Sequence, residues 1–415
     1  MSARPNLDRL PEPADRRVAV RVTRDALRQI RGGTPWLYDG SITSTSHDGA
    51  PGDLAVVFDH DRKFAAIGLY DPTSPIRVKL LHRGSPSRID AEFWRSSIAA
   101  ALDRRADLAH DRDTDAYRLV HGENDGLPGL VVDRYASTLV VKLYTPAWFA
   151  HLRPVLDALA DLQPHDRVVL RLARSVTSGE TYGLHDGDVV VGPPVDGPIR
   201  FVERGLSMEA DVVRGQKTGH FLDQRDNRVL VRGMARGASV LDVFASTGGF
   251  SLAAAAGGAT SVHLVDQSGP ALETAERNLA HNRHLAEVRR CAVHTTVGDA
   301  FDVLTRLGER DERFDIVIVD PPSFASNQGA VERALAAYAR LTRLALAVTK
   351  RGGTLVQASC SSRVTADDFV RTVLDAAASA RRDVSEIRRT GHAVDHPVGF
   401  EFGSYLKAVF LRVDS

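Results

Sequence analysis

One stretch constrains the fold of this chain more than any other: a short apolar run followed closely by two glycines. Residues 240–244 hold four apolar side chains around one acid, Asp242, which is typical of a strand buried on both faces. Gly248-Gly249 indicates a tight turn, and residues 250–256 indicate the helix that follows it. Strand, glycine turn and helix together place backbone N–H groups beside a ligand.

A second acid, Asp266, lies at the distance along the chain that is expected for the next strand of such a fold. The apolar run 261–265 predicts the next strand, which ends at Asp266, twenty-four residues after Asp242. An acid at the tip of the second strand holds the ribose of a nucleoside in folds of this kind. The two acids therefore predict a nucleotide-type cofactor site. The alternative is an ordinary strand–turn–helix unit of an α/β sheet.

The spacing indicates which cofactor. Dinucleotide sites use G-x-G-x-x-G to bring the backbone close to a pyrophosphate. Here the pattern is Asp-x-Phe-x-x-x-Gly-Gly, formed by Asp242, Phe244, Gly248 and Gly249. An acid directed into the turn suits a ligand with an amino group and a positive charge. S-adenosylmethionine has both and carries no phosphate, so it is the predicted cofactor.

Composition limits the other possibilities. The 415 residues predict two or three domains. The 53 Lys and Arg balance the 53 Asp and Glu, so any contact with nucleic acid must come from local patches. Two cysteines exclude a disulfide scaffold or a cysteine-rich metal site, and we expect no metal. The chain shows neither a signal peptide nor an apolar run of membrane-spanning length, so a cytoplasmic protein without a membrane partner is expected.

Three domains are predicted along the chain. Residues 17–85 indicate a small β-rich domain, residues 91–190 an α+β middle domain, and residues 199–415 an α/β domain that carries the cofactor site. The middle domain is expected to open with a helix from Ala91 to about Ala109. The chain should close with an antiparallel pair of strands near 384–389 and 405–413.

The first domain has a candidate RNA contact. A helix predicted over 23–30 leads into Arg31, two glycines and Trp36. An arginine beside a glycine loop and an exposed aromatic ring suit phosphate contact and base stacking. The alternative places Trp36 and Tyr38 in the core and the arginines on a solvated face.

Two further regions complete the predicted site. Residues 216–228 concentrate polar groups before a helix, and we interpret them as a lid over the methionine end of the cofactor rather than a plain surface loop. Further strands should end at Asp299, placed to accept the adenine amine, and at Asp320. Cys360 follows the neighbouring strand. The remaining candidates are the lid residues Phe221, Asp223 and Arg225 for the cofactor, and Pro321 and Pro322 for the substrate.

The order of these strand-end acids looks like a Rossmann-like class I methyltransferase dependent on S-adenosylmethionine. Four motifs resemble the bacterial 23S rRNA cytosine-5 methyltransferase I family: Gly215-Gln-Lys-Thr-Gly-His-Phe-Leu-Asp-Gln-Arg225, Asp320-Pro-Pro-Ser-Phe324, Ser359-Cys-Ser361, and Asp395-His-Pro397 with Tyr405-Leu-Lys407. The N-terminal segment is similar to the family's PUA domain, an RNA-binding β-barrel, and residues 122–129 resemble its middle domain. The resemblance implies a substrate in 23S rRNA or a large-subunit assembly intermediate.

The chemistry of cytosine gives Cys360 its expected role. Cytosine C5 is too weak a nucleophile to take a methyl group until a thiolate has added at C6. Asp320 would stabilise the adduct by contact with N3. The alternative for Cys360 is a small buried hydrophobe, which is what we expect of Cys291. Ser323 stands where many RNA cytosine-5 methyltransferases carry a second cysteine, so the base that removes the C5 proton is not identified.

Other functions stay open at this point. A guanine-N7 methyltransferase of rRNA shares the Gln-Lys-Thr-Gly and Asp-Pro-Pro motifs and needs no cysteine. An exocyclic-amine methyltransferase would carry an aromatic residue directly after the prolines, where this chain has Ser323. A small-molecule methyltransferase has little use for a PUA-like domain, and a non-catalytic RNA-binding protein does not need four strand-end acids. The sequence leaves a monomer or a homodimer open.

Overall fold

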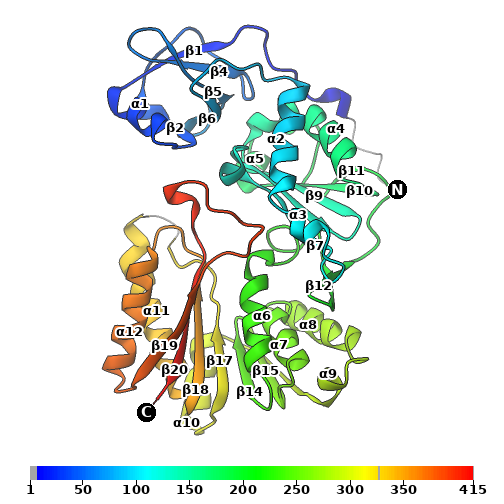
Figure 1. Ribbon diagram of the computed structural model, residues 1–415, viewed down its shortest axis with the longest axis vertical. Helices are drawn as coiled ribbons and strands as arrows, with labels where there is room; N and C mark the ends of the chain where they lie inside the picture. The colour runs from blue at the N-terminus through cyan, green and yellow to red at the C-terminus, as the bar shows by residue number, and fades with distance from the viewer. Residues whose placement is uncertain (1–6, 326–327, 415) are drawn as a thin grey trace. The chain divides into compact units, whose positions relative to one another are not determined.

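The computed structural model describes residues 7–325 and 328–414, which form two compact units (Figure 1). Unit 1 consists of Met1–Phe201, Ala210–Leu222 and Val394–Gly403. Unit 2 consists of Val202–Glu209, Asp223–Ala393 and Ser404–Ser415. Each unit is therefore built from separate stretches of chain. The three domain limits expected from the sequence stay a prediction.

The N-terminal part of unit 1 is a six-stranded sheet with the order β2-β6-β5-β4-β1-β3. Its strands are β1 (Val18–Val22), β2 (Trp36–Tyr38), β3 (Ile42–Thr45), β4 (Leu54–Phe58), β5 (Phe64–Tyr70) and β6 (Ile76–Arg83). Helix α1 (Arg24–Arg31) begins after Thr23, whose side chain accepts a hydrogen bond from the N–H of Ala26. The helix buries Leu27 and Ile30 in the core of this sheet.

The second sheet of unit 1 has five strands in the order β11-β10-β9-β8-β7. Its strands are β7 (Ala116–His121), β8 (Leu130–Tyr135), β9 (Thr138–Leu143), β10 (Arg167–Leu172) and β11 (Val189–Val191). Its helices are α2 (Ala91–Asp103), α3 (Ala106–Ala109), α4 (Leu152–Leu162) and α5 (Arg174–Thr177), with 3₁₀ turns η3 (Gly122–Asp125) and η4 (Pro146–His151). The 3₁₀ turn η1 (Leu7–Arg9) precedes the first sheet in the chain, and η2 (Asp39–Ser41) joins its strands β2 and β3.

The single helix predicted from Ala91 to about Ala109 is wrong, because the chain breaks between α2 and α3. The break turns Arg105 inward, where its guanidinium forms a buried ion pair with Asp125 at 2.7 Å. A straight helix would give that side chain a different direction. Arg105 is the N-cap residue of α3, and its buried ion pair stabilises the chain in this broken form.

Unit 2 contains a seven-stranded sheet with the order β16-β15-β14-β17-β18-β20-β19. Its strands are β14 (Ser239–Val243), β15 (Ser261–Asp266), β16 (Ala292–Val297), β17 (Phe314–Val319), β18 (Thr349–Ser359), β19 (Val384–Thr390) and β20 (Lys407–Val413). The first five run parallel, and β20 pairs antiparallel with both β18 and β19. The expected C-terminal antiparallel pair is confirmed. A separate pair, β12 (Ile199–Glu203) and β13 (Leu206–Ala210), precedes the sheet.

Helices cover both faces of this sheet (Figure 1). They are α6 (Arg225–Met234), α7 (Gly249–Ala256), α8 (Gly269–His281), α9 (Ala286–Arg290), α10 (Ala300–Glu309), α11 (Val331–Ala347) and α12 (Ala366–Ser379), with the 3₁₀ turn η6 (Gln328–Ala330) before α11. The 3₁₀ turn η5 (Leu222–Gln224) lies where the chain passes from unit 1 to unit 2, and η7 (Glu401–Gly403) belongs to unit 1. Side chains from α10, α11 and α12 share one core with the central strands. The α/β fold expected for this part of the chain is confirmed.

The strand order reverses next to β14, which pairs with β15 on one side and β17 on the other. Open α/β sheets bind ligands beyond the carboxyl ends of the strands at this kind of reversal. The predicted acids Asp242, Asp266, Asp299 and Asp320 lie in or just after the carboxyl ends of β14, β15, β16 and β17, which is the edge where this topology binds ligands. Within residues 7–325 and 328–414, no helix is long and apolar enough to cross a membrane.

Candidate cofactor and catalytic site

Asp242 lies on β14 with its carboxylate almost fully buried. One oxygen, Oδ2, accepts hydrogen bonds from the backbone N–H of Ser251 at 3.0 Å and from its hydroxyl at 2.7 Å. The other oxygen, Oδ1, has no hydrogen-bond partner in the part of the chain that the structure describes. Burial raises the pKa of Asp242 to about 6, although the bonds from Ser251 act in the opposite direction. The acid thus anchors the start of α7 and keeps one acceptor available.

The turn between β14 and α7 is held in an uncommon backbone conformation. Phe244, Ser246 and Gly248 have φ values of 65°, 48° and 76°. A Cβ atom on Gly248 would lie 2.6 Å from the Cβ of Ala275 on α8, so only glycine fits there. Strained backbone of this kind clusters where a protein shapes a ligand site.

Behind the turn, Gly249 permits the close approach of a buried arginine. A Cβ atom on Gly249 would lie 3.0 Å from the Cδ of Arg228 on α6. The guanidinium of Arg228 forms two hydrogen bonds of 2.6 Å with Glu203 on β12. This ion pair is buried and fixes α6 to β12, which holds the Arg228 side chain against Gly249 at the start of α7.

Asp266 and Asp299 lie at the carboxyl ends of β15 and β16, as predicted. Asp266 accepts hydrogen bonds from the backbone N–H of Ser246 at 2.9 Å and of Ser268 at 2.8 Å, which joins the glycine turn to the tip of β15. Asp299 caps α10 through the N–H of Phe301 and also accepts from the side chain of Gln267 at 2.8 Å. Both acids are half-buried, so an outer lone pair of each stays open to a ligand.

Asp320 and Cys360 end the neighbouring strands β17 and β18. The N–H of Asp320 donates to the carbonyl oxygen of Val243 at 3.4 Å, which places this acid next to the glycine turn. The thiol of Cys360 lies 3.8 Å from the carbonyl oxygen of Pro321 and is half-buried. The thiol is therefore a direct neighbour of the Asp-Pro-Pro segment. Pro322 is exposed beside it.

The predicted lid divides between the two units. Phe221 belongs to unit 1. The ammonium of Lys217 lies over its ring in a cation–π contact, 4.6 Å from the ring centroid. Asp223 and Arg225 belong to unit 2 and are buried. Asp223 accepts a hydrogen bond of 2.7 Å from the hydroxyl of Tyr405, a contact that the sequence pattern did not predict.

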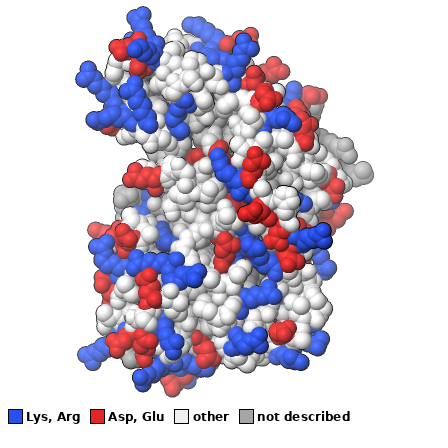
Figure 2. All heavy atoms as spheres, in the orientation of Figure 1, with Lys and Arg blue, Asp and Glu red and all other residues white. Residues whose placement is uncertain are grey.

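The two candidate RNA contacts lie in unit 1. Arg31 is exposed at the end of α1 and forms a 3.4 Å ion pair with Asp59. Basic side chains gather around α1 on the face shown in Figure 2. Trp36 is half-buried: its indole N–H donates to Glu123, and its ring packs edge-on against Phe400 at 5.1 Å. Trp36 is thus held by packing, and its contact with RNA stays a prediction.

Sequence reasoning assigned no role to the groups around Cys360 on adjacent elements. The Ser359 hydroxyl donates to the Tyr338 hydroxyl at 2.8 Å, and Lys407 reaches the carbonyls that follow Cys360. Burial raises the pKa of Tyr338 to about 12. The sequence carries no local signal for this contact, because Lys407 comes opposite Ser359 only through the register of β18 and β20.

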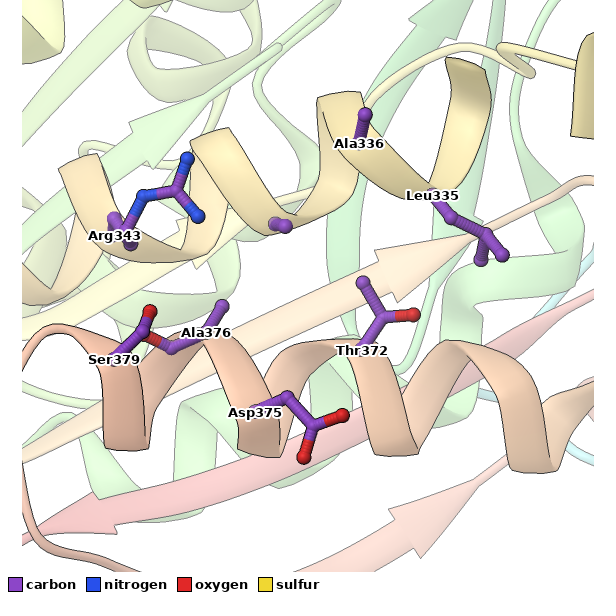
Figure 3. Close-up of a pocket in the computed structure, with 8 residues that line it drawn as sticks. Leu335, Ala336, Arg343, Thr372, Asp375, Ala376 and Ser379 are labelled. Carbon is purple, nitrogen blue, oxygen red and sulfur yellow. The ribbon is translucent and has the colours of Figure 1, made fainter. Parts of the chain in front are cut away.

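A surface groove elsewhere in unit 2 does not share these features. It lies between α11 and α12 and is lined mainly by short side chains, including Ala336, Thr372, Ala376 and Ser379 (Figure 3). Arg343 and Asp375 also line it. The groove is formed by helix surfaces, whereas the strand-end acids and Cys360 belong to the carboxyl edge of the sheet. We therefore assign the candidate site to the sheet edge.

The residues at this edge fit S-adenosylmethionine. The buried Oδ1 of Asp242 offers an acceptor for an ammonium group, and the strained turn beside it exposes backbone at the start of α7. The outer oxygens of Asp266 and Asp299 suit ribose hydroxyls and an adenine amine. In the described part of the chain, no cluster of side chains suitable for a metal ion is present.

Comparison with known proteins defines the class of the chain. Residues 119–400 match the family model of S-adenosylmethionine-dependent methyltransferases, and residues 20–83 match that of PUA-like domains. Two solved structures share the fold: a methyltransferase complexed with SAH (TM-score 0.82, 22% identity, 95% of this chain and 100% of that one) and an S-adenosylmethionine-dependent methyltransferase from Streptococcus mutans (TM-score 0.80, 21% identity, 95% and 100%). The protein is an S-adenosylmethionine-dependent methyltransferase with a PUA-like N-terminal domain.

Two relatives narrow the class to a family. One, from Deinococcus radiodurans, is named ribosomal RNA large subunit methyltransferase and is 45% identical over 410 residues, 97% of this chain and 99% of the relative. Another, from Escherichia coli O139:H28, is named ribosomal RNA large subunit methyltransferase I and is 34% identical over 388 residues, 91% and 95% of the two chains. The chain belongs to the ribosomal RNA large subunit methyltransferase I family, and the expected family is confirmed.

Proposed function

We propose that this protein methylates C5 of a cytosine in large-subunit ribosomal RNA, with Cys360 as the covalent nucleophile. The observation that carries this proposal is the position of the Cys360 thiol, half-buried and 3.8 Å from the carbonyl of Pro321, beside the half-buried Asp320. A methyltransferase that acts on an exposed lone pair, such as guanine N7, has no use for a thiol at this place. The names of the relatives support rRNA as the substrate, and a ribosomal substrate would place the protein in the cytoplasm.

The residues of the chain have distinct parts in this reaction. The Cys360 thiolate adds to cytosine C6, so that an S–C6 bond forms and the C5=C6 electron pair makes C5 nucleophilic. S-adenosylmethionine, when bound, supplies the electrophilic methyl group that C5 takes. Loss of the C5 proton and departure of the Cys360 thiolate then restore the C5=C6 double bond. Asp320, protonated or hydrogen-bonded, contacts cytosine N3 and stabilises the adduct.

The cofactor assignments belong to the same proposal. Asp242 accepts the ammonium of the methionine part, with Phe244, Gly248 and Gly249 forming the turn against it. Asp266 holds the ribose, and Asp299 accepts the adenine amine. Phe221, Asp223 and Arg225 line the methionine end. Pro321 and Pro322 position the target base, and Arg31 and Trp36 contact the RNA elsewhere.

The product identifies the reaction. The full chain is incubated with labelled S-adenosylmethionine and unmethylated 23S rRNA, and the nucleosides are separated by mass spectrometry. We expect 5-methylcytidine from the wild type and a loss of more than about a thousandfold in Cys360→Ala, since removal of a nucleophile abolishes the covalent path. Cys291→Ala is the matched control, because that second cysteine is buried outside the site, and it should keep full activity.

A trapping experiment tests the covalent step separately. RNA with 5-fluorocytidine has no C5 proton to lose, so the adduct should persist as a denaturant-resistant protein–RNA band with the wild type and be absent with Cys360→Ala. A 7-methylguanosine product, or full methylation by Cys360→Ala, would show that the cysteine mechanism is wrong.

A further inference from the structure

The buried side chain of Lys407 is hydrogen-bonded to the loop that contains Cys360. We propose that Lys407 is a positioning residue that fixes the 360–364 loop and supplies the positive charge that stabilises the Cys360 thiolate. The proposal rests on the proposed nucleophilic role of Cys360 and adds to it the group that makes the thiol reactive.

The contacts of Lys407 determine how it acts on the loop. Lys407 opens β20 directly opposite Ser359, the last residue of β18. Its ammonium donates to the carbonyl oxygens of Ser361 and Val364, which flank the turn after Cys360, and to that of Tyr405 at 3.3 Å. Two of these three acceptors belong to the cysteine loop, so the lysine ties the loop to the neighbouring strand.

The number of acceptors also indicates the charge of the side chain. An ammonium group has three N–H donors, whereas a neutral amine has two and a lone pair that would face a carbonyl oxygen. Three carbonyl oxygens surround the Nζ atom of Lys407, so its contacts suit the charged form. The side chain is only 6% exposed, and water therefore does little to screen this charge.

No carboxylate among residues 7–325 and 328–414 lies within ion-pair distance of Lys407. Burial lowers the pKa of Lys407 to about 8, and the charge of Cys360 is the influence that raises it. A buried cation without a counter-ion is costly, and a nearby thiolate offsets that cost. Each charged form therefore favours the other, so the lysine and the cysteine titrate as a pair.

Three other described groups near Cys360 supply no positive charge. The Tyr338 hydroxyl on α11, with its pKa raised to about 12, stays neutral near pH 7. Asp320 at the end of β17 would oppose a thiolate when ionised. The carbonyl oxygen of Pro321 accepts from the thiol form. Among these neighbours of Cys360, Lys407 is the one that carries a positive charge.

Formation of the thiolate needs no reactant beyond water. The Cys360 S–H bond breaks, its proton goes to solvent, and the electron pair stays on sulfur opposite the Lys407 ammonium. The thiolate then has the electrons for the attack on a pyrimidine carbon. When the adduct breaks down, the same charge stabilises the departing thiolate.

The pH dependence of alkylation measures this effect without RNA or cofactor. The full chain is treated with iodoacetamide from pH 5 to 10, and modification of each cysteine is followed by peptide mass spectrometry. We expect the wild-type midpoint for Cys360 to lie below the ordinary thiol pKa of about 8.5. In Lys407→Met the midpoint should rise by about one unit, which makes alkylation at pH 7 about tenfold slower. Lys407→Arg should restore most of the shift.

Two controls separate charge from unfolding. Cys291 is buried, and burial raises the pKa of its thiol to about 11, so it should resist alkylation for as long as the chain stays folded. Lys350→Met removes a lysine that pairs with Asp315 at the opposite end of the sheet and should leave the Cys360 midpoint unchanged.

Two results would overturn the proposal. One is a wild-type midpoint at or above about 8.5, which needs no variant. The other is an unchanged midpoint in a folded Lys407→Met protein. Methylation by Cys360→Ala at the wild-type rate would instead reject the proposed nucleophile and would leave the alkylation result standing, so the two failures are distinguishable.

Discussion

Asp242 combines two properties that link its protonation to cofactor binding: a buried oxygen without a described partner and a pKa raised to about 6. Above pH 6 the carboxylate is charged and attracts an ammonium group, and below pH 6 it is neutral. We therefore expect S-adenosylmethionine affinity to fall about tenfold for each unit of pH below 6. Calorimetric titrations between pH 5 and 8 measure this slope.

Substitution tests the same residue at constant pH. Asp242→Asn keeps the shape of the side chain but removes the charge, so affinity at pH 7.5 should fall about ten- to a hundredfold and lose its pH dependence. Asp315→Asn is the matched control, because Asp315 holds Ser239 at the other end of β14. Unchanged affinity in Asp242→Asn would contradict the assignment.

The stability of the protein without cofactor should also depend on Asp242. Its pKa is higher in the folded chain than the ordinary value of 3.8, so the folded state binds more protons between about pH 4 and 6. The stability that this proton gives is full below pH 4 and is lost as the pH rises through 6, by about 3 kcal/mol. Urea unfolding of the wild type and Asp242→Asn at pH 4.5 and 7 should show this fall in the wild type alone.

At the scale of elements, the glycine turn depends on contact between α7 and α8. Gly248→Ala must adopt a positive φ and must also push the Cβ of Ala275 away, so it should lower the free energy of unfolding by about 1–3 kcal/mol. Gly237→Ala has a similar φ of 73° and no atom within 4 Å of the added Cβ. Equal losses in the two variants would show that the helix contact is unimportant.

The elements that could be predicted are those that are determined by their own local sequence. The apolar runs of β14, β15 and β17 specify buried parallel strands, and their terminal acids mark the edge where a ligand binds. The break between α2 and α3 could not be predicted, because it depends on Asp125, which lies twenty residues beyond Arg105. The contact of Lys407 with the Cys360 loop likewise depends on strand register, which local patterns do not encode.

At the scale of the whole molecule, a segment from near the C-terminus supports unit 1. Asp395 accepts a 2.8 Å hydrogen bond from the backbone N–H of Arg118 on β7, and its own carbonyl oxygen accepts from Arg105. These residues are separated by 277 and 290 positions. From sequence alone, Asp395 falls in the predicted α/β domain of residues 199–415, because no local pattern relates it to β7.

Loss of that carboxylate should therefore affect a strand far away in sequence. Asp395→Ala removes the carboxylate oxygen that accepts the 2.8 Å hydrogen bond from the buried N–H of Arg118, and this loss should cost about 1–3 kcal/mol. Asp395→Asn keeps an oxygen at the same place and should cost less. Hydrogen exchange of the β7 amides measures the effect, and equal protection of Arg118 in wild type and Asp395→Ala would contradict it.

Unit 1 is built from three separate segments of the chain, and this affects how the protein folds during its synthesis on the ribosome. Chains usually fold from the N-terminus while they are being synthesised, one domain after another. Here the segment Val394–Gly403 of unit 1 follows Asp223–Ala393 of unit 2 in the chain. Unit 1 therefore stays incomplete until that long stretch of unit 2 has been synthesised, so it cannot finish folding before the bulk of unit 2 exists.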